Sequence, residues 1–370
     1  MSNHPRKLSH GCHLKKLSHS GVTEYFISAL VEEGDSPATM FESMDACLRK
    51  LGSPCVLRMD VLGRVNTMGT ESLQQKYCYH CADCALNHTR PEAEGVCPVG
   101  GVYVHAVEGG SVKPIWLGGQ LIGNLFEDRY IRYVSLDNLL PDSCLERPKQ
   151  AQQVFERMED ALKGAGLSFS HVVRTWLYLN EILDWYDEFN QARDGFFKSR
   201  RVKDGLIPCS TGIGGANTNG TAIQASVLAA DPLSDAVTIQ AIPSPLQCPA
   251  LDYGSSFSRA VEIRTPEIQR LYVSGTASID QEGPTRYPDD VDKQIAYTLQ
   301  VVEAILSSRN LDWMDVNRAV AYFKFRDDFD RFKDYCQQND LSHLPVGLTQ
   351  MDVCRDDLLF EIELDAVKVV

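Results

Sequence analysis

The chain ends in the stretch Met351-Asp352-Val353-Cys354-Arg355-Asp356-Asp357-Leu358-Leu359-Phe360-Glu361-Ile362-Glu363-Leu364. It predicts two strands joined by a polar turn at Arg355 to Asp357, because Leu358 to Leu364 alternates apolar and acidic residues. A period of two places Glu361 and Glu363 on one face of the second strand, opposite its apolar residues. That face is either a solvated sheet surface or the wall of a site, and the stretch alone leaves both open.

A longer pattern recurs upstream as an internal repeat. The segment Phe41-Glu42-Ser43-Met44-Asp45-Ala46-Cys47-Leu48 is similar to Phe155-Glu156-Arg157-Met158-Glu159-Asp160-Ala161-Leu162, and each precedes a glycine and a strand (56–58 and 172–174). A looser third copy runs through 295–306 and 315–322. The second and third copies continue into an acidic-aromatic helix, at 184–189 and 327–332, and then into final strands at 222–230 and 348–369.

Each copy is predicted to be a strand, an amphipathic helix and a strand, which is an α/β (α+β) unit with its helices on one face of a mixed sheet. Three such sheets can close around a common centre and remove exposed edges, so we expect a pseudo-trimeric barrel. The expected organisation is a disordered tail at 1–20, a degenerate first unit with a Cys-rich insertion at 21–112, a second unit at 113–245 and a third unit with the candidate active site at 246–370.

The composition of the chain argues against several classes of protein. The net charge of −14 over 370 residues disfavours a broad nucleic-acid-binding surface. No apolar run approaches the roughly 20 residues of a membrane span, so we expect no membrane association. The basic, His-rich N-terminus lacks the apolar core of a secretory signal. Twelve cysteines without such a signal predict reduced thiols or metal ligands in a cytoplasmic protein.

Four of these cysteines form a cluster at Cys78, Cys81, Cys84 and Cys97, in the place where the first copy lacks its second helix. Cys-x-x-Cys spacing brings two thiolates to one metal, and four thiolates suit a structural, tetrahedral zinc. An iron–sulfur cluster and unligated thiols are the alternatives. A metal here would stabilise the incomplete first unit, because metal binding contributes folding free energy.

The repeat, with Tyr272-Val273-Ser274-Gly275 and Phe360-Glu361-Ile362-Glu363, resembles the Rid/YjgF (endoribonuclease L-PSP) family, which has a chorismate-mutase-like fold. That family is trimeric, with active sites in clefts between neighbouring units. Within it, the sequence is similar to the chorismatase branch. Four segments carry this likeness: Tyr253-Gly254-Ser255-Ser256-Phe257-Ser258-Arg259-Ala260, Ser274-Gly275-Thr276-Ala277-Ser278-Ile279, Pro208-Cys209-Ser210-Thr211-Gly212-Ile213-Gly214 and the stretch from Asp352 to Glu363.

The resemblance implies cleavage of the enolpyruvyl ether of a small cyclic carboxylate such as chorismate, without a cofactor for the chemistry. Glu361 matches the branch's catalytic acid, Cys354 and Arg355 its Cys-Arg pair, and Ala277 a pocket residue that influences the product. The residue types suit the reaction, because an enol ether is cleaved by protonation of its methylene carbon. Arg355 and Arg259 are candidate clamps for a substrate carboxylate.

Each of these residues could instead have a purely structural role. Arg355 could be a turn residue paired with Asp356 or Asp357, and Cys354 a small buried hydrophobic residue. Gly275 and Thr276 could present a backbone N–H and a hydroxyl to a ligand, or simply end a strand.

Departures from the branch leave the function open. Asp280-Gln281 and Tyr287-Pro288-Asp289-Asp290 replace histidine-containing segments, and acids near the cleft would disfavour a doubly anionic substrate. One alternative is a Rid-type enamine/imine deaminase, although Pro208-Cys209-Ser210 and Pro345-Val346-Gly347 lack the arginine of that family's Pro-Ala-Arg turn. Another is a non-catalytic scaffold that binds a metabolite. The assembly is expected to be a monomeric pseudo-trimer or a homotrimer.

Overall fold

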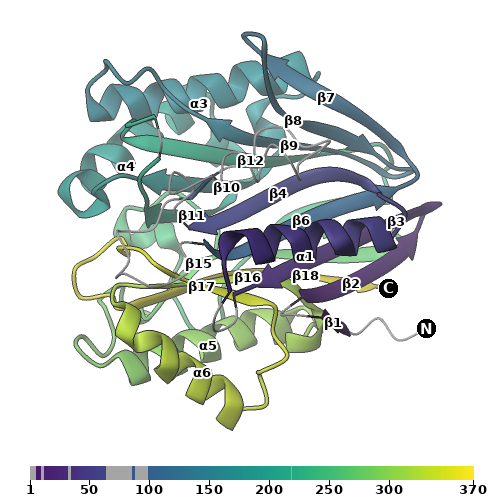
Figure 1. The fold of residues 1–370 in the computed structure, drawn as a ribbon. Helices are drawn as coiled ribbons and strands as arrows, with labels where there is room; N and C mark the ends of the chain where they lie inside the picture. The colour runs from purple at the N-terminus through teal and green to yellow at the C-terminus, as the bar shows by residue number, and fades with distance from the viewer. Residues whose placement is uncertain (1–5, 10–11, 32–34, 64–85, 88–98, 218) are drawn as a thin grey trace.

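The computed structural model describes residues 6–9, 12–31, 35–63, 86–87, 99–217 and 219–370. These residues form three separate six-stranded sheets of mixed direction, so the predicted α/β class with mixed sheets is confirmed. Each sheet carries helices, and in Figure 1 α3 and α4 lie on one side of the molecule, with α5 and α6 on the other. Within the described residues none of the three sheets closes on itself, so the predicted barrel is wrong.

The strand orders show how closely the units agree. The first sheet has the order β1 (Arg6–Ser9), β2 (Cys12–His19), β3 (Val22–Leu30), β6 (Val99–Glu108), β4 (Cys55–Gly63), β5 (Leu86–Asn87), with α1 (Pro37–Lys50). The second has β11 (Cys209–Gly214), β10 (Val172–Leu179), β12 (Ile223–Pro232), β9 (Ile131–Leu139), β8 (Gln120–Glu127), β7 (Ser111–Leu117), with α3 (Arg147–Gly164) and α4 (Ile182–Ser199).

The third sheet has the order β13 (Thr238–Ile242), β14 (Ala260–Arg264), β15 (Ile268–Ala277), β18 (Phe360–Val369), β16 (Val316–Phe323), β17 (Val346–Gln350), with α5 (Val291–Ser308) and α6 (Phe329–Gln338). β10 pairs with β11, and β16 with β17, in parallel. The ladders of β4, β10 and β16 each shift register immediately before Arg58, Arg174 and Arg318, so these three arginines occupy equivalent positions.

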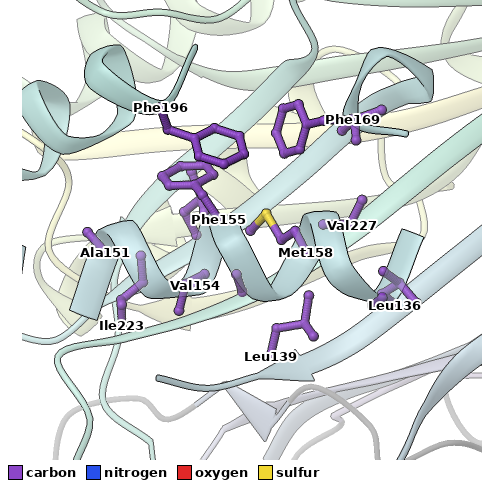
Figure 2. Close-up of a cluster of buried hydrophobic side chains, with 14 of the residues drawn as sticks. Leu136, Leu139, Ala151, Val154, Phe155, Met158, Phe169, Phe196, Ile223 and Val227 are labelled. Atoms are coloured by element: carbon purple, nitrogen blue, oxygen red, sulfur yellow. The ribbon is translucent and has the colours of Figure 1, made fainter. Parts of the chain in front are cut away.

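Amphipathic helices attach to the sheets through one apolar stripe. In α3, residues at helical spacing, from Ala151 through Val154 and Phe155 to Met158, are fully buried. Figure 2 shows them packed towards Leu136 and Val227 of the sheet, with Phe169 and Phe196 alongside. The helix is therefore held by burial of this stripe, as its sequence pattern predicts.

The opposite faces of the three sheets meet in a shared interior. One buried cluster joins Leu57, Val173 and Ile263, which come from the first, second and third sheets. A second joins Leu62, Tyr178 and Tyr322, again one from each sheet. The face of each sheet that lies away from its helices is therefore packed against the other two sheets.

Three local predictions were wrong. Met351 to Cys354 is not a strand, and residues 351–359 form an irregular connection into β18, because β18 pairs with β15 and β16 and not with a hairpin partner. Cys12–His19 is not disordered, since it forms β2 and pairs with β3. β13 belongs to the third sheet, although the predicted boundary after residue 245 assigned it to the second unit. In the described part of the chain, no helix has the length and apolar character needed to cross a membrane.

The packing of α3 predicts a large stability effect at its centre. Phe155 is fully buried and contacts the rings of Phe169, Phe189 and Phe196. We expect Phe155→Ala to lower the free energy of unfolding by about 3–5 kcal/mol through lost burial and a residual cavity. Phe325, which is 52% exposed, provides a matched control. Phe325→Ala should cost less than about 1 kcal/mol in the same urea titration, and equal losses would contradict this account of the core.

Candidate active site

A pocket lies between the second and third sheets and collects most of the predicted site residues. It encloses about 170 Å³ of solvent-accessible space. Glu361, Arg355, Arg259, Cys354, Ala277 and Gly275 all line it. Thr276 does not line it, because its buried hydroxyl donates a 2.9 Å hydrogen bond to the carbonyl oxygen of Ser274. The second unit supplies the facing wall through β11 and α4.

The alternation of β18 places Glu361 in this pocket. Phe360, Ile362 and Leu364 enter the core beneath the helices of the third unit, so the acids point to the opposite face, as predicted. That face is not a solvated surface, because the second unit covers it. Glu361 is 4% exposed and Glu363 is fully buried.

Gly275 allows the carboxyl of Glu361 to lie against the backbone of β15. A Cβ atom at position 275 would collide with Oε1 of Glu361 and would also press on the methyl group of Thr211. The residue therefore has to be glycine for the carboxyl to keep this position, which is a close backbone approach and not merely a strand end.

The two carboxyls of β18 have opposite surroundings. Glu363 accepts hydrogen bonds from Nη2 of Arg174 (2.7 Å), Nη1 of Arg318 (2.7 Å), Nε1 of Trp176 (2.9 Å) and the hydroxyl of Thr211. Burial alone would raise the pKa of Glu363, but the two guanidinium groups outweigh burial and lower it to about 2. Glu363 is therefore a fixed negative charge at neutral pH.

Glu361 receives none of these donors. No described residue donates a hydrogen bond to its carboxyl, which faces the pocket. Burial, reinforced by the negative charge of Glu363, raises the pKa of Glu361 from 4.5 to about 8, although Arg174 and Arg259 oppose the shift. Two carboxyls on one strand face thus separate into a permanent anion and an acid that carries its proton at neutral pH, a pairing found at general-acid sites.

The predicted arginines are held in place without a carboxylate partner among the residues that the structure describes. Arg259 is 4% exposed and donates from Nε (3.0 Å) and Nη2 (2.9 Å) to the carbonyl oxygen of Cys248. Arg355 donates to the carbonyl oxygen of Gly283 at 2.8 Å. Both guanidinium groups lie over the ring of Tyr253, at 5.3 and 5.2 Å from its centroid.

The alternative in which Arg355 pairs with a neighbouring aspartate is wrong, because both aspartates have other partners. Asp356 lies 3.5 Å from the ammonium of Lys324, and Asp357 accepts a hydrogen bond from Thr285. Burial raises the pKa of the Cys354 thiol to about 12, so this thiol stays protonated and is no nucleophile at neutral pH.

The sequence patterns did not predict the residues that α4 contributes to the pocket. Tyr186, Asn190 and Arg193 recur at helical spacing and all line the pocket. Arg193 is 2% exposed, donates to Oδ1 of Asn190 at 2.5 Å and forms no ion pair with any described carboxylate. The signal was polar residues at positions of an amphipathic helix where apolar ones were expected.

The acids that were expected to repel an anionic substrate lie elsewhere. Neither Asp280, Asp289 nor Asp290 lines the pocket. Asp290 instead caps α5 through the backbone N–H of Lys293 and pairs with that residue's ammonium. The prediction that these acids lie at the cleft, which was one of the two arguments against a doubly anionic substrate, was therefore wrong; the loss of the histidines is not tested.

A second cavity lies between all three sheets, but its charged residues form ion pairs with one another. Glu24 is bound by Arg270 and by His105 at 2.7 Å. Asp60 is bound by Arg58 at 2.8 Å and Arg318 at 3.1 Å. The pocket at Glu361 differs because its acid and its buried arginines have no charged partner in the described protein, so we take it as the candidate site.

Comparisons with known proteins show what the sequence and the fold resemble. The endoribonuclease L-PSP family model matches residues 144–215. A chorismatase from Streptomyces hygroscopicus is 28% identical over 53% of this chain and 62% of its own length. A 3-hydroxybenzoate synthase from the same organism is 25% identical over 57% of this chain and 66% of its own length. The chain thus matches less than two thirds of the length of each relative.

A crystal structure of a chorismatase has the same fold, with a TM-score of 0.66 and 18% identity over 93% of this chain and 98% of that one. The chain is thus similar to the chorismatase-like branch of the Rid/YjgF superfamily. The predicted resemblance is therefore confirmed.

The four cysteines of the predicted metal cluster, Cys78, Cys81, Cys84 and Cys97, lie outside the described residues. The zinc or iron–sulfur site of this chorismatase-like chain therefore stays a prediction. Among the residues that are described, no group of three or more His, Cys, Asp or Glu side chains is arranged to hold a metal ion.

The protonated state of Glu361 has a measurable effect on stability. Its carboxyl binds a proton up to about pH 8 in the folded protein, but only up to about pH 4.5 when unfolded. Wild-type stability therefore falls between these two values as pH rises. Glu361→Gln cannot ionise, so we expect it to gain stability relative to wild type, by on the order of several kcal/mol, from pH 4.5 to pH 8 in urea titrations.

Glu262→Gln is the matched control. Glu262 is 1% exposed and its pKa is lowered, because hydrogen bonds from Arg309, Gln240 and Gln269 outweigh the effect of burial. This variant should instead lose stability relative to wild type as pH rises through the acid range. The same trend in both variants would argue against a protonated Glu361.

Proposed function

We propose that this protein cleaves the enolpyruvyl ether of chorismate or of a closely related cyclic carboxylate, with Glu361 as general acid. The observation that carries the proposal is the position of Glu361, a buried carboxyl that faces the pocket and has no hydrogen-bond donor among the described residues. Burial there raises the pKa of Glu361 to about 8. The likeness to a chorismatase and a 3-hydroxybenzoate synthase supports the same substrate class.

The reaction follows from the chemistry of an enol ether. Glu361 donates its proton to the terminal methylene carbon of the enolpyruvyl group, and the ether oxygen stabilises the resulting cation. Water adds to that cationic carbon and gives back one proton, which restores the acid. The hemiketal carbon then loses its bond to the ether oxygen that the ring carries. This step releases pyruvate and a cyclic diene alcohol. Water is the only co-reactant, and no cofactor takes part.

Buried arginines would bind the substrate carboxylates. Arg193 and Arg259 are charged, almost fully buried and without a carboxylate partner in the described protein, which is costly unless a ligand supplies the anion. They come from different units and lie with Arg355 around one pocket. Three arginines around one pocket, with Asp187 as the other acidic residue beside Glu361, suit a dicarboxylate such as chorismate.

The other functions have less support. The Rid-type deaminase needs a carboxylate-binding arginine in a Pro-Ala-Arg turn, and Ser210 occupies that position in the wall of this pocket. A non-catalytic scaffold would have no need for an acid held in its protonated form beside unpaired arginines. We also infer that one chain supplies all three units of a pseudo-trimer, since equivalent positions of the three sheets carry different, mutually bonded residues.

A pyruvate-release assay with chorismate tests the proposed reaction. Wild type should release pyruvate, and Glu361→Gln should reduce kcat by about a hundredfold or more, because amide cannot donate the proton. Glu262→Gln, which changes a buried acid away from the pocket, should keep the wild-type rate. Absence of pyruvate from wild type would rule out chorismate as substrate.

The arginines should govern substrate binding more than turnover. We expect Arg193→Gln and Arg259→Gln each to raise KM for chorismate about tenfold or more, because each removes a charge-assisted hydrogen bond to a carboxylate. Arg201→Gln is the control, since Arg201 lies on the surface and pairs only with Asp204 among the described residues. An unchanged KM in both pocket variants would exclude them as carboxylate ligands.

A further inference from the structure

The two acids of β18 occur together in one unit and are both absent from the other two. Strand register identifies the equivalent residues, because each acid faces a defined residue of the neighbouring strand. Glu361 and Glu363 face Tyr322 and Val320; Gln224 and Ser226 face Tyr178 and Trp176; Gly101 and Tyr103 face Leu62 and Asp60. Neither acid is present without the other, which links Glu363 to the function of Glu361.

Glu363 cannot reach the pocket, and it does not line it. Its carboxylate is fully buried and takes donors from the second unit (Arg174, Trp176, Thr211) and from β16 (Arg318). Glu361 lies two residues away on the same face and receives no donor from the described residues. A fixed anion this close disfavours a second negative charge.

Thr211 connects the two acids sterically as well. Its hydroxyl donates to Glu363 and accepts the backbone N–H of Gly275 at 3.0 Å. Gly275 in turn lies against the carboxyl of Glu361. Glu363 thus influences both the charge and the location of the acid without touching a ligand.

We propose that Glu363 is a positioning residue whose permanent negative charge keeps Glu361 in its proton-donating form. The inference rests on the proposed function, because it treats Glu361 as the general acid. Several charged or titratable groups surround Glu361. Near it lie Glu363 on its own strand, Arg174 of β10, Arg259 before β14, Tyr322 of β16 and Cys354. Tyr186, Asp187, Arg193, Tyr253 and Arg355 also line the pocket.

The pH dependence of kcat tests the proposal. A general acid works while protonated, so wild-type kcat should fall as pH rises through about 8. Glu363→Gln removes the repelling charge and leaves Arg174 and Arg318 in place, so the fall should move to lower pH. A shift of two pKa units lowers the rate at about pH 7 roughly tenfold, and acid pH should restore it.

Control variants separate charge from structure. Glu363→Asp keeps the negative charge, so its kcat should fall at the same pH as that of wild type. Glu262→Gln removes another buried, ion-paired acid of the third sheet and should not change the pH at which kcat falls. If Glu363→Gln does not fold, Arg318→Gln/Glu363→Gln removes both members of the ion pair, which proteins tolerate better than one unpaired charge. Asp60 then keeps Arg58 as its partner. In this double variant kcat should still fall at a lower pH than in wild type.

A spectroscopic titration distinguishes failure of this proposal from failure of the proposed function. The infrared carbonyl band of protonated Glu361 is assigned as the band that Glu361→Gln lacks, and its loss with rising pH needs no substrate. If this band disappears at a lower pH in Glu363→Gln than in wild type, the proposal is supported even if chorismate is not cleaved. A band that titrates as in wild type, or a kcat lowered equally at every pH, would overturn it.

Discussion

The burial of one carboxylate, that of Glu363, is the interaction on which this structure depends. A charge fully removed from water is tolerated only if it is paired and hydrogen-bonded. Its partners come from two sheets, and Arg318 carries the connection on to Asp60 of the first sheet at 3.1 Å. The indole N–H of Trp176 donates to Glu363. The guanidinium carbon of Arg58 lies 3.6 Å from the centroid of the same indole ring. Any rearrangement of the three sheets would leave this charge unpaired.

Having three units in one chain allows equivalent positions to differ. Register across the ladders makes Glu24, Tyr133 and Arg270 equivalent, and Arg270 binds both Glu24 and, at 3.1 Å, Tyr133. Three identical chains around a threefold axis would bring together three copies of one residue and could not form this combination. The same freedom lets only the third unit keep an acid pair, while the counterpart between the first and third units is filled by Tyr103 bonded to the carbonyl oxygen of Ala319.

The sequence predicted the features that depend on local periodicity. The repeat located the helices, and alternation in β18 placed Glu361 and Glu363 on one face, because side-chain direction in a strand is set by the backbone. It could not tell that this face would be covered, since the covering unit lies more than a hundred residues earlier in the chain. Arg193 was missed for the same reason, and the two strands joined by a turn at 351–364 were predicted because pairing partners are not visible in a local pattern.

The difference between the two acids arises from which donors reach them and not from residue type. Both are glutamates of one strand, and both are buried against the second unit. Two guanidinium groups, an indole N–H and a hydroxyl converge on Glu363, so burial there is compensated and the charge persists. At Glu361 the same burial is not compensated, and the nearest anion is the one that the assembly has already fixed. The contacts that hold the sheets together therefore also raise the pKa of the one carboxyl that faces the pocket.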